Sequence, residues 1–246
     1  DAAAAHLNAA SRAALDPDET KTGSFVAMQD TFLLNVEPPL NSAPASLSVN
    51  LDGAIMSEYR HAYTRGLAEA NAGNVTAAQE QLTQLEQLLT QLPAIFERNA
   101  VPPNDPSRTV PEVEHLQLKA AVLAAQSHLD DAIALLRQAV EKSRNLPYAF
   151  GPPDPEKPTE ELLGDLLMRE GEPGEALGPY ISQLKHTPNR THSLLGLAQA
   201  ESAVGDKAAA RETARKLLGI WNQADKNYAP VAEAQRIAEE IAPQAK

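Results

Sequence analysis

The six histidines come first, because imidazoles bind transition metals and transfer protons near neutral pH. No pair of them has the His-x-x-x-His or His-Glu-x-x-His spacing that lets two imidazoles on one helix reach the same ion. His61 and His115 stand at equivalent places in two similar segments, but a long insertion separates them. We expect surface or partly buried histidines, with a metal site as the alternative, and we predict no cofactor. The histidines are His6, His61, His115, His128, His186 and His192.

Other catalytic patterns are missing from the sequence. The absence of cysteine removes thiol nucleophiles, thiolate zinc sites and disulfides. No Gly-x-Ser-x-Gly nucleophile elbow is present. The turn from Gly171 to Gly174 contains Glu172 and Pro173, which is the wrong chemistry for binding phosphate. The sequence therefore predicts a protein that is not an enzyme and has no catalytic residue.

One stretch carries a 34-residue skeleton that starts at Lys157. Within it Gly164, Gly171 and Ala176 occupy positions 8, 15 and 20, and Ala198, Gly205 and Ala210 follow 34 residues later. This pattern resembles the tetratricopeptide (TPR) repeat, a helix–turn–helix unit with small residues at positions 8 and 20 and a turn near position 15. Small residues there would let the two helices of a hairpin approach closely.

Two upstream segments carry the same skeleton with wider spacing. Gly66, Gly73 and Ala78 form one, and Ala120, Ser127 and Ala132 form the other. The spacing of position 8 falls from 54 to 44 to 34 residues along the chain. Prolines fill both insertions, so we expect connecting loops or extended crossings there.

Helix start signals accompany these segments. Asp130 is placed as an N-cap, and Glu172 followed by Pro173 is typical of a helix start. Pro179 lies inside the helix expected after that start, so it should kink the helix or displace its beginning.

A group of acids stands at the start of a predicted helix. Glu160, Glu161 and Asp165 there could simply complement the helix dipole. Alternatively, the TPR resemblance implies that positions 2, 5, 9 and 12 of each first helix line a concave groove. That reading gives four candidate binding residues: Gln117, Glu161, Asp165 and Gln199.

The same resemblance bears on the partner. TPR domains that clamp chaperone C-terminal carboxylates use Lys, Asn and Arg at such positions, and those residues are missing here. An acidic, amide-lined groove would suit a basic or amide-rich protein or peptide segment. Arg190, which opens the next first helix, could form an ion pair with Glu161 and neutralise it.

The chain also resembles a wider family over roughly residues 55–240, most specifically in its later segments. It is similar to the C-terminal part of a family of uncharacterised bacterial TPR-containing proteins, which implies an α-solenoid and no established reaction. Members carry a histidine-rich N-terminal half that is missing here, so we expect a fragment or a reduced relative. The alternative function is then an accessory domain of a larger enzyme or metal-handling protein whose chemistry lies in that half. The segments that carry this resemblance are 146–153, 158–165, 189–198 and 220–225.

The two ends of the chain carry their own helix patterns. Residues 2–15 read as a helix, and Phe25, Met28 and Phe32 are spaced for a buried stripe on a second one. Near the C-terminus an apolar stripe predicts a capping helix, against which Trp221 should be buried. That stripe consists of Val231, Ala234, Ile237, Ala238 and Ile241.

Charge and hydropathy exclude several classes of partner. With 21 basic and 33 acidic residues the 246-residue chain has a net charge of −12, which argues against nucleic acid and anionic membrane surfaces. Its best apolar run, residues 120–125, is far shorter than the roughly 20 residues of a membrane span, so we predict no membrane insertion. Nothing in the sequence distinguishes a cytoplasmic from an exported protein.

These observations predict an all-α protein, a TPR-like α-solenoid in which antiparallel helix hairpins form a right-handed superhelix. We expect residues 1–50 to be an N-terminal helical segment, with an incomplete repeat as one interpretation. Residues 51–242 should form the repeat domain and its capping helix. The predicted function is a non-enzymatic module that binds a protein or peptide, which is fold-level analogy.

Overall fold

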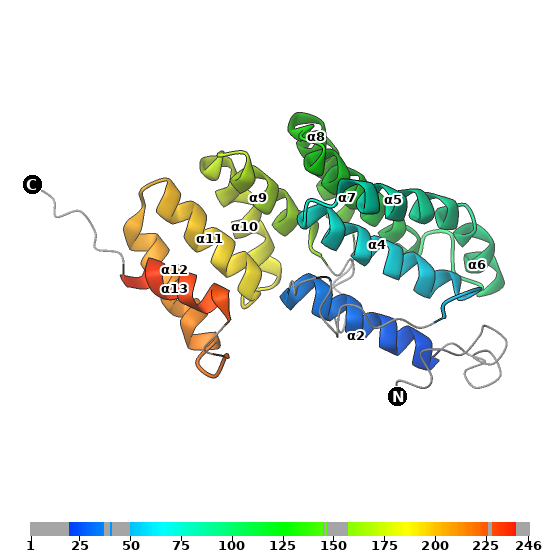
Figure 1. The fold of residues 1–246 in the computed structure, drawn as a ribbon, viewed down its shortest axis with the longest axis horizontal. Coiled ribbons are helices and arrows are strands. Elements are labelled where there is room, and N and C mark those ends of the chain that lie inside the picture. Colours follow the sequence, from blue (N-terminus) through cyan, green and yellow to red (C-terminus); the bar gives the residue numbers. More distant parts are fainter. Residues whose placement is uncertain are drawn as a thin grey trace, which may run out of the picture. The chain divides into compact units, whose positions relative to one another are not determined.

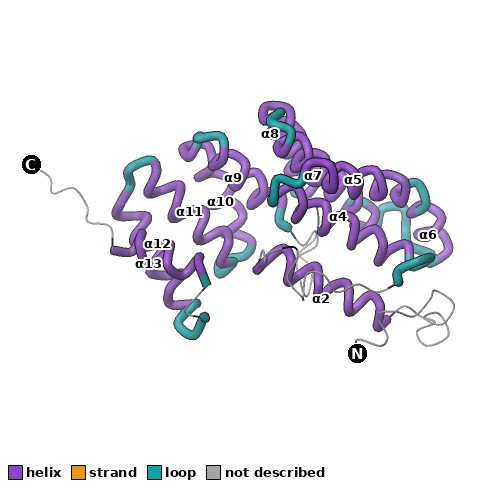
Figure 2. The backbone as a smooth tube through the Cα atoms, in the orientation of Figure 1, coloured by secondary structure: helices purple, strands orange, loops and turns teal. Residues whose placement is uncertain are grey.

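A computed structural model describes residues 20–36, 40, 50–144, 146, 157–225 and 228–239. Within those ranges the chain forms eleven α-helices and one 3₁₀ helix, with no strand, so the all-α prediction is confirmed. Figure 2 shows these helices joined by loops. The helix predicted at residues 2–15 lies outside the described residues, as does most of the second proline-rich insertion.

The chain divides into two compact units, residues 1–157 and 158–246, each described here by itself. This division falls between two of the predicted hairpins. The boundary predicted at residue 50 stays a prediction, because residues 41–49 lie outside the described part.

Unit 1 contains two helical hairpins and an additional helix. Helix α4 pairs with α5, α7 pairs with α8, and α7 packs against both α4 and α5. The additional helix, α2, lies along α4 (Figure 1). The helices are α2 (Thr20–Val36), α4 (Ile55–Asn71), α5 (Val75–Leu89), α6 (Leu92–Arg98), η2 (Pro106–Arg108), α7 (Val110–Ala125) and α8 (Leu129–Ser143).

The first insertion is more ordered than the expected loop, because it contains α6 and η2. Pro93, Pro106 and Pro111 each lie at the start of one of these helices or of α7, where a missing N–H costs nothing. Helix α8 begins at Leu129 with His128 as its N-cap, two residues before the predicted Asp130.

Unit 2 contains two further hairpins and a final helix. Helix α9 pairs with α10, α11 pairs with α12, α10 packs on α11, and α13 packs against α12 and α11. Glu172 and Pro173 begin α10 as predicted, and the helix then runs without a break past Pro179, which does not displace its start. The helices are α9 (Thr159–Arg169), α10 (Pro173–His186), α11 (Thr191–Ala203), α12 (Lys207–Ile220) and α13 (Ala229–Glu239).

The turn inside each hairpin has the same backbone conformation. Gly73, Ser127, Gly171 and Gly205, the four predicted turn residues, have φ of 77°, 67°, 79° and 90°. In each case the next residue donates its N–H to the carbonyl five residues earlier, at 2.9 to 3.0 Å. This bond closes the end of the first helix in the manner of a Schellman motif. The four hairpins are therefore related by local structure as well as by sequence.

The glycines at position 8 are closely packed, but their nearest neighbours are not the small residues at position 20. A Cβ on Gly66 would lie 2.6 Å from Leu118 of the next hairpin, and one on Gly164 would lie 2.8 Å from the ring of Tyr180. Ala176, at position 20, is buried as predicted, but Tyr180, four residues later, fills the space beside Gly164. A larger residue at either glycine would displace these neighbours.

Phe25, Met28 and Phe32 of α2, which were predicted to form a buried stripe, are more exposed than the apolar residues on the other face of the helix. Met28 is 67 % exposed, and Phe25 and Phe32 are only half-buried. Helix α2 instead buries Val26 and Leu33 on the side that packs against α4. The prediction was wrong because α2 has apolar residues on two faces, and sequence spacing alone does not say which face meets a neighbour.

The C-terminal helix agrees with its prediction where it is described. Ala234 and Ile237 of α13 are completely buried. Trp221, which was predicted to be buried, is only half-buried; it packs against the cluster that contains Ala234, and its ring meets that of Tyr228 edge-on at 5.6 Å. Ile241 lies outside the described residues.

Candidate functional site

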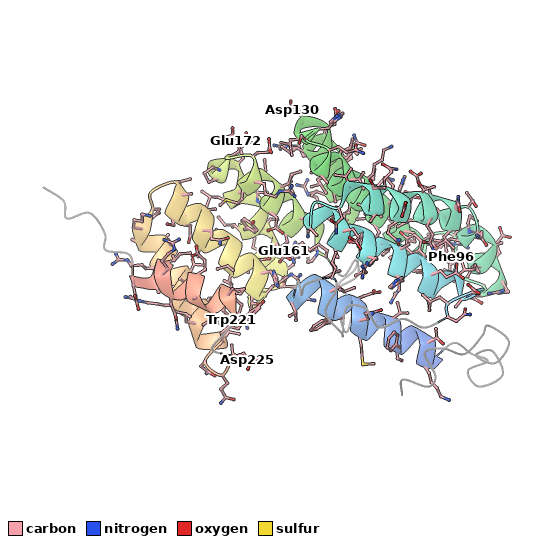
Figure 3. The ribbon with its side chains drawn as sticks, in the orientation of Figure 1. Phe96, Asp130, Glu161, Glu172, Trp221 and Asp225 are labelled. Atoms are coloured by element: carbon pink, nitrogen blue, oxygen red, sulfur yellow. The ribbon has the colours of Figure 1, made fainter. Side chains whose placement is uncertain are left out.

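Glu161, in the first turn of α9, is completely buried and fully partnered (it is labelled in Figure 3). Arg190 donates from Nε to Oε2 at 2.6 Å and from Nη2 to Oε1 at 2.8 Å. Ser193 of α11 donates its hydroxyl proton to Oε2 at 2.5 Å. A guanidinium and a carboxylate in this two-bond arrangement form one of the strongest polar contacts in proteins. The ion pair suggested by the sequence is therefore formed, within the interior of unit 2.

Asp165, one turn after Glu161, is half-buried and serves a different partner. It accepts a hydrogen bond of 2.7 Å from the hydroxyl of Tyr180 on α10. Burial, together with the charge of Asp165, raises the pKa of the Tyr180 phenol well above its ordinary value, so Tyr180 stays a neutral donor. Glu161 and Asp165 are thus not a pair of unpaired carboxylates.

Tyr180 itself fills a narrow space between two glycines. A Cβ on Gly164 of α9 would lie 2.8 Å from the Tyr180 ring. A Cβ on Gly196 of α11 would lie 2.6 Å from the Tyr180 hydroxyl oxygen. Only residues without a side chain leave room for the ring at both places. Tyr180 therefore ties the first hairpin of unit 2 to the first helix of the second.

Gln117 of α7 is also completely buried. Its Oε1 accepts from the hydroxyl of Tyr63 on α4 at 2.5 Å, and its Nε2 donates to the carbonyl of Lys157 at 2.9 Å. Tyr59, one turn before Tyr63, similarly donates to the carbonyl of Pro111 at 3.0 Å. The bonds from Tyr59 and Tyr63 join α4 to α7, the two first helices of unit 1.

The four predicted binding residues therefore differ in whether their polar side-chain atoms are available to a ligand. Gln117 and Glu161 have their polar atoms occupied inside the protein and offer none to a ligand in this conformation. Asp165 on α9 and Gln199 on α11 are half-buried, on neighbouring first helices of unit 2. A binding role for Asp165 and Gln199 stays a prediction.

The histidines that the structure describes do not gather. His115 lies 3.0 Å from Glu86 through Nε2. Nδ1 of His61 is buried without a hydrogen-bond partner, and burial, assisted by the nearby charge of Arg65, lowers the pKa of His61 below 6.5. Among the described residues no three His, Asp or Glu side chains are placed to hold a metal ion. His6 lies outside them.

Sequence reasoning missed three residues of the polar network. Tyr63, Tyr180 and Ser193 each bind a polar side chain of another helix. The signal for these contacts in the sequence was weak. Tyr180 lies one helical turn after Ala176, the small residue at position 20, and Gly196 lies 32 residues after Gly164. Neither spacing says that the ring lies between the two glycines.

Comparisons with known proteins give no family. No model of a protein family matches the chain, and no curated protein is significantly similar to it. Within the described ranges, no helix is both long enough and apolar enough to cross a membrane.

Proposed function

We propose that the hairpins are of the TPR type and that the protein is a non-enzymatic module that binds an extended segment of a protein or peptide. The observation that carries this proposal is the common turn at Gly73, Ser127, Gly171 and Gly205, combined with small residues seven positions before each. Arrays of such hairpins form long surfaces on which extended segments bind. The inference from that architecture to binding is an analogy at the level of the fold.

The inner face of unit 2 is the proposed binding surface. In TPR arrays the residues at positions 9 and 12 of first helices line this face. They are Asp165 and Met168 on α9 and Gln199 and Ser202 on α11, and all four are half-buried. Position 5 does not contribute at α9, since Glu161 is enclosed by Arg190 and Ser193.

Charge supports a basic or amide-rich partner. The chain carries a net charge of −12, and the proposed surface contains the carboxylate of Asp165 and the amide of Gln199. Such a surface attracts Lys and Arg side chains, pairs with Asn and Gln, and repels acidic segments. Binding should weaken as salt concentration rises, because added ions screen exposed charges.

A peptide-display selection on the immobilised full chain would test this proposal. We expect selected peptides to be rich in Lys, Arg, Asn or Gln. Gln199→Lys should weaken their binding at least tenfold, measured by fluorescence polarisation, because it places a cation on the proposed surface. Gln138→Lys makes the same change at an exposed position of the second helix α8 and should leave affinity unchanged. Selection of no peptide, or equal affinity for both variants, would overturn the proposal.

A further inference from the structure

Helix α2 presents a row of apolar side chains on a face that α4 does not cover. Phe25, Met28, Phe32 and Val36 follow one another at intervals of three, four and four residues, which places them along one side of a helix. Met28 is 67 % and Val36 is 45 % exposed, among the highest values for large apolar side chains in the described residues. Figure 1 shows α4 running along α2, and the residues of α2 that are buried there include Val26 and Leu33. We call these four residues the α2 stripe.

The charge of the α2 stripe limits what binds it. Helix α2 contains two charged residues: Asp30 is buried away from the stripe, whereas Lys21 is exposed and stands four residues before Phe25, at the end of the stripe. Within residues 20–36, the part of this segment that the structure describes, the α2 stripe is thus flanked by a cation and contains no carboxylate. Lys21 would repel a basic partner, whereas it would attract a second copy of this chain, whose net charge is −12.

The α2 stripe is also complementary to itself. Phe25 and Phe32 lie almost symmetrically about Met28. If two copies of α2 pair in antiparallel fashion about a two-fold axis, Phe25 meets Phe32 of the second copy and the two Met28 side chains meet at the centre. Intervals of three and four residues are those of an interhelical seam, and methionine adapts its shape to a neighbour. A two-fold interface requires this kind of self-complementarity.

We propose that the protein self-associates through the α2 stripe, with a second copy of the chain as the occupant. This inference does not depend on the proposed function. A pair of 17-residue helices is about 25 Å long, and the buried area lies near or below the ~1,200 Å² at the low end of stable interfaces. The dimer is accordingly weak and reversible. Since its stripe is apolar and the chains repel each other, added salt strengthens it.

Sedimentation of the full chain from low to high micromolar concentration tests this proposal. The weight-average mass should rise from the 26.3 kDa of one chain towards twice that value, and more steeply at high salt. Met28→Glu should hold the chain at the monomer mass at every concentration. Gln138→Glu should associate like the unaltered chain, because it adds the same charge at an exposed position of α8, away from α2. A monomer under all conditions, or equal behaviour of the two variants, would overturn the proposal.

A cross-linking experiment tests the antiparallel arrangement. The chain has no cysteine, so Met28→Cys introduces its sole thiol. Two such thiols would meet near the two-fold axis and form a disulfide-linked dimer under mild oxidation, whereas those of Gln138→Cys, on the exposed side of α8, would not. If instead the Met28→Cys variant stays monomeric and its thiol is shielded from a soluble alkylating reagent, another part of the same chain covers the α2 stripe and the proposal is wrong.

Discussion

Arg190 holds Glu161 by two hydrogen bonds, of 2.6 and 2.8 Å, across the step from α9 to α11. The side chain of Glu161 is 0 % exposed and that of Arg190 is 11 % exposed. Water screens such a pair poorly, so each charge depends on the other. The contact fixes how one hairpin of unit 2 follows the next.

Arg190→Ala should destabilise unit 2 by about 3–5 kcal/mol, because it leaves the buried carboxylate of Glu161 without its counter-charge. Trp221 is the only tryptophan and lies in unit 2, so its fluorescence during urea unfolding reports this unit. Arg236→Ala, which removes an exposed pair with Glu233, should cost less than about 1 kcal/mol. Equal losses in the two variants would contradict the burial of the pair.

Gly164→Ala should cost roughly 1–3 kcal/mol, because the added Cβ would lie 2.8 Å from the ring of Tyr180. Gly219→Ala on α12, also in unit 2, is the matched control. Nothing lies within 4 Å of its Cβ position, so helix propensity alone predicts a gain of up to about 1 kcal/mol.

Combining Gly164→Ala with Tyr180→Leu isolates the contact between them. The double variant should lose less stability than the two single losses added together, since the smaller side chain removes the clash. Additive losses, again followed through Trp221 fluorescence, would show that Gly164 and Tyr180 do not meet.

Ser127→Gly should leave stability unchanged or raise it by up to about 1 kcal/mol, because Ser127 has φ of 67° and a left-handed backbone disfavours any side chain. Gly171→Ala, at the equivalent turn of unit 2, should lower stability by about 1–2 kcal/mol. Thermal unfolding followed by circular dichroism measures both. The reverse order of stabilities would contradict the shared turn.

Unit 1 should lose stability as pH falls below 6.5, because the folded state lowers the pKa of His61. The unfolded chain then takes up a proton on His61 at a higher pH than the folded chain does, so acidification favours unfolding. Hydrogen exchange in α4 should quicken over this range, beyond the intrinsic effect of pH. His61→Gln should abolish the extra change, while His128→Gln, at an exposed residue, should retain it.

Local features of the fold were predictable from the sequence. The turn at Ser127 was found without a glycine, because Ala120 and Ala132 placed it in the repeat frame. Glu172 and Pro173 marked the start of α10, since capping and the missing proline N–H act within one turn of helix. Signals of this kind depend on neighbours in sequence.

Long-range features were not predictable in the same way. The burial of Gln117 depends on Tyr63, which is 54 residues away, and spacing does not give that distance in space. The direction of the α2 stripe depends on which face of α2 meets α4, and Met28 was assigned to the wrong side. For Glu161 the partner Arg190 was foreseen, but the third contact from Ser193 was not.

Hydrogen exchange of unit 2 with and without a selected peptide tests the central claim most directly, namely that the first helices bind an extended segment. We predict that the peptide slows exchange in α9 and α11 and leaves the second helices α10 and α12 unchanged. Slowed exchange confined to α10 and α12, or none in a complex that is saturated with peptide, would contradict the claim.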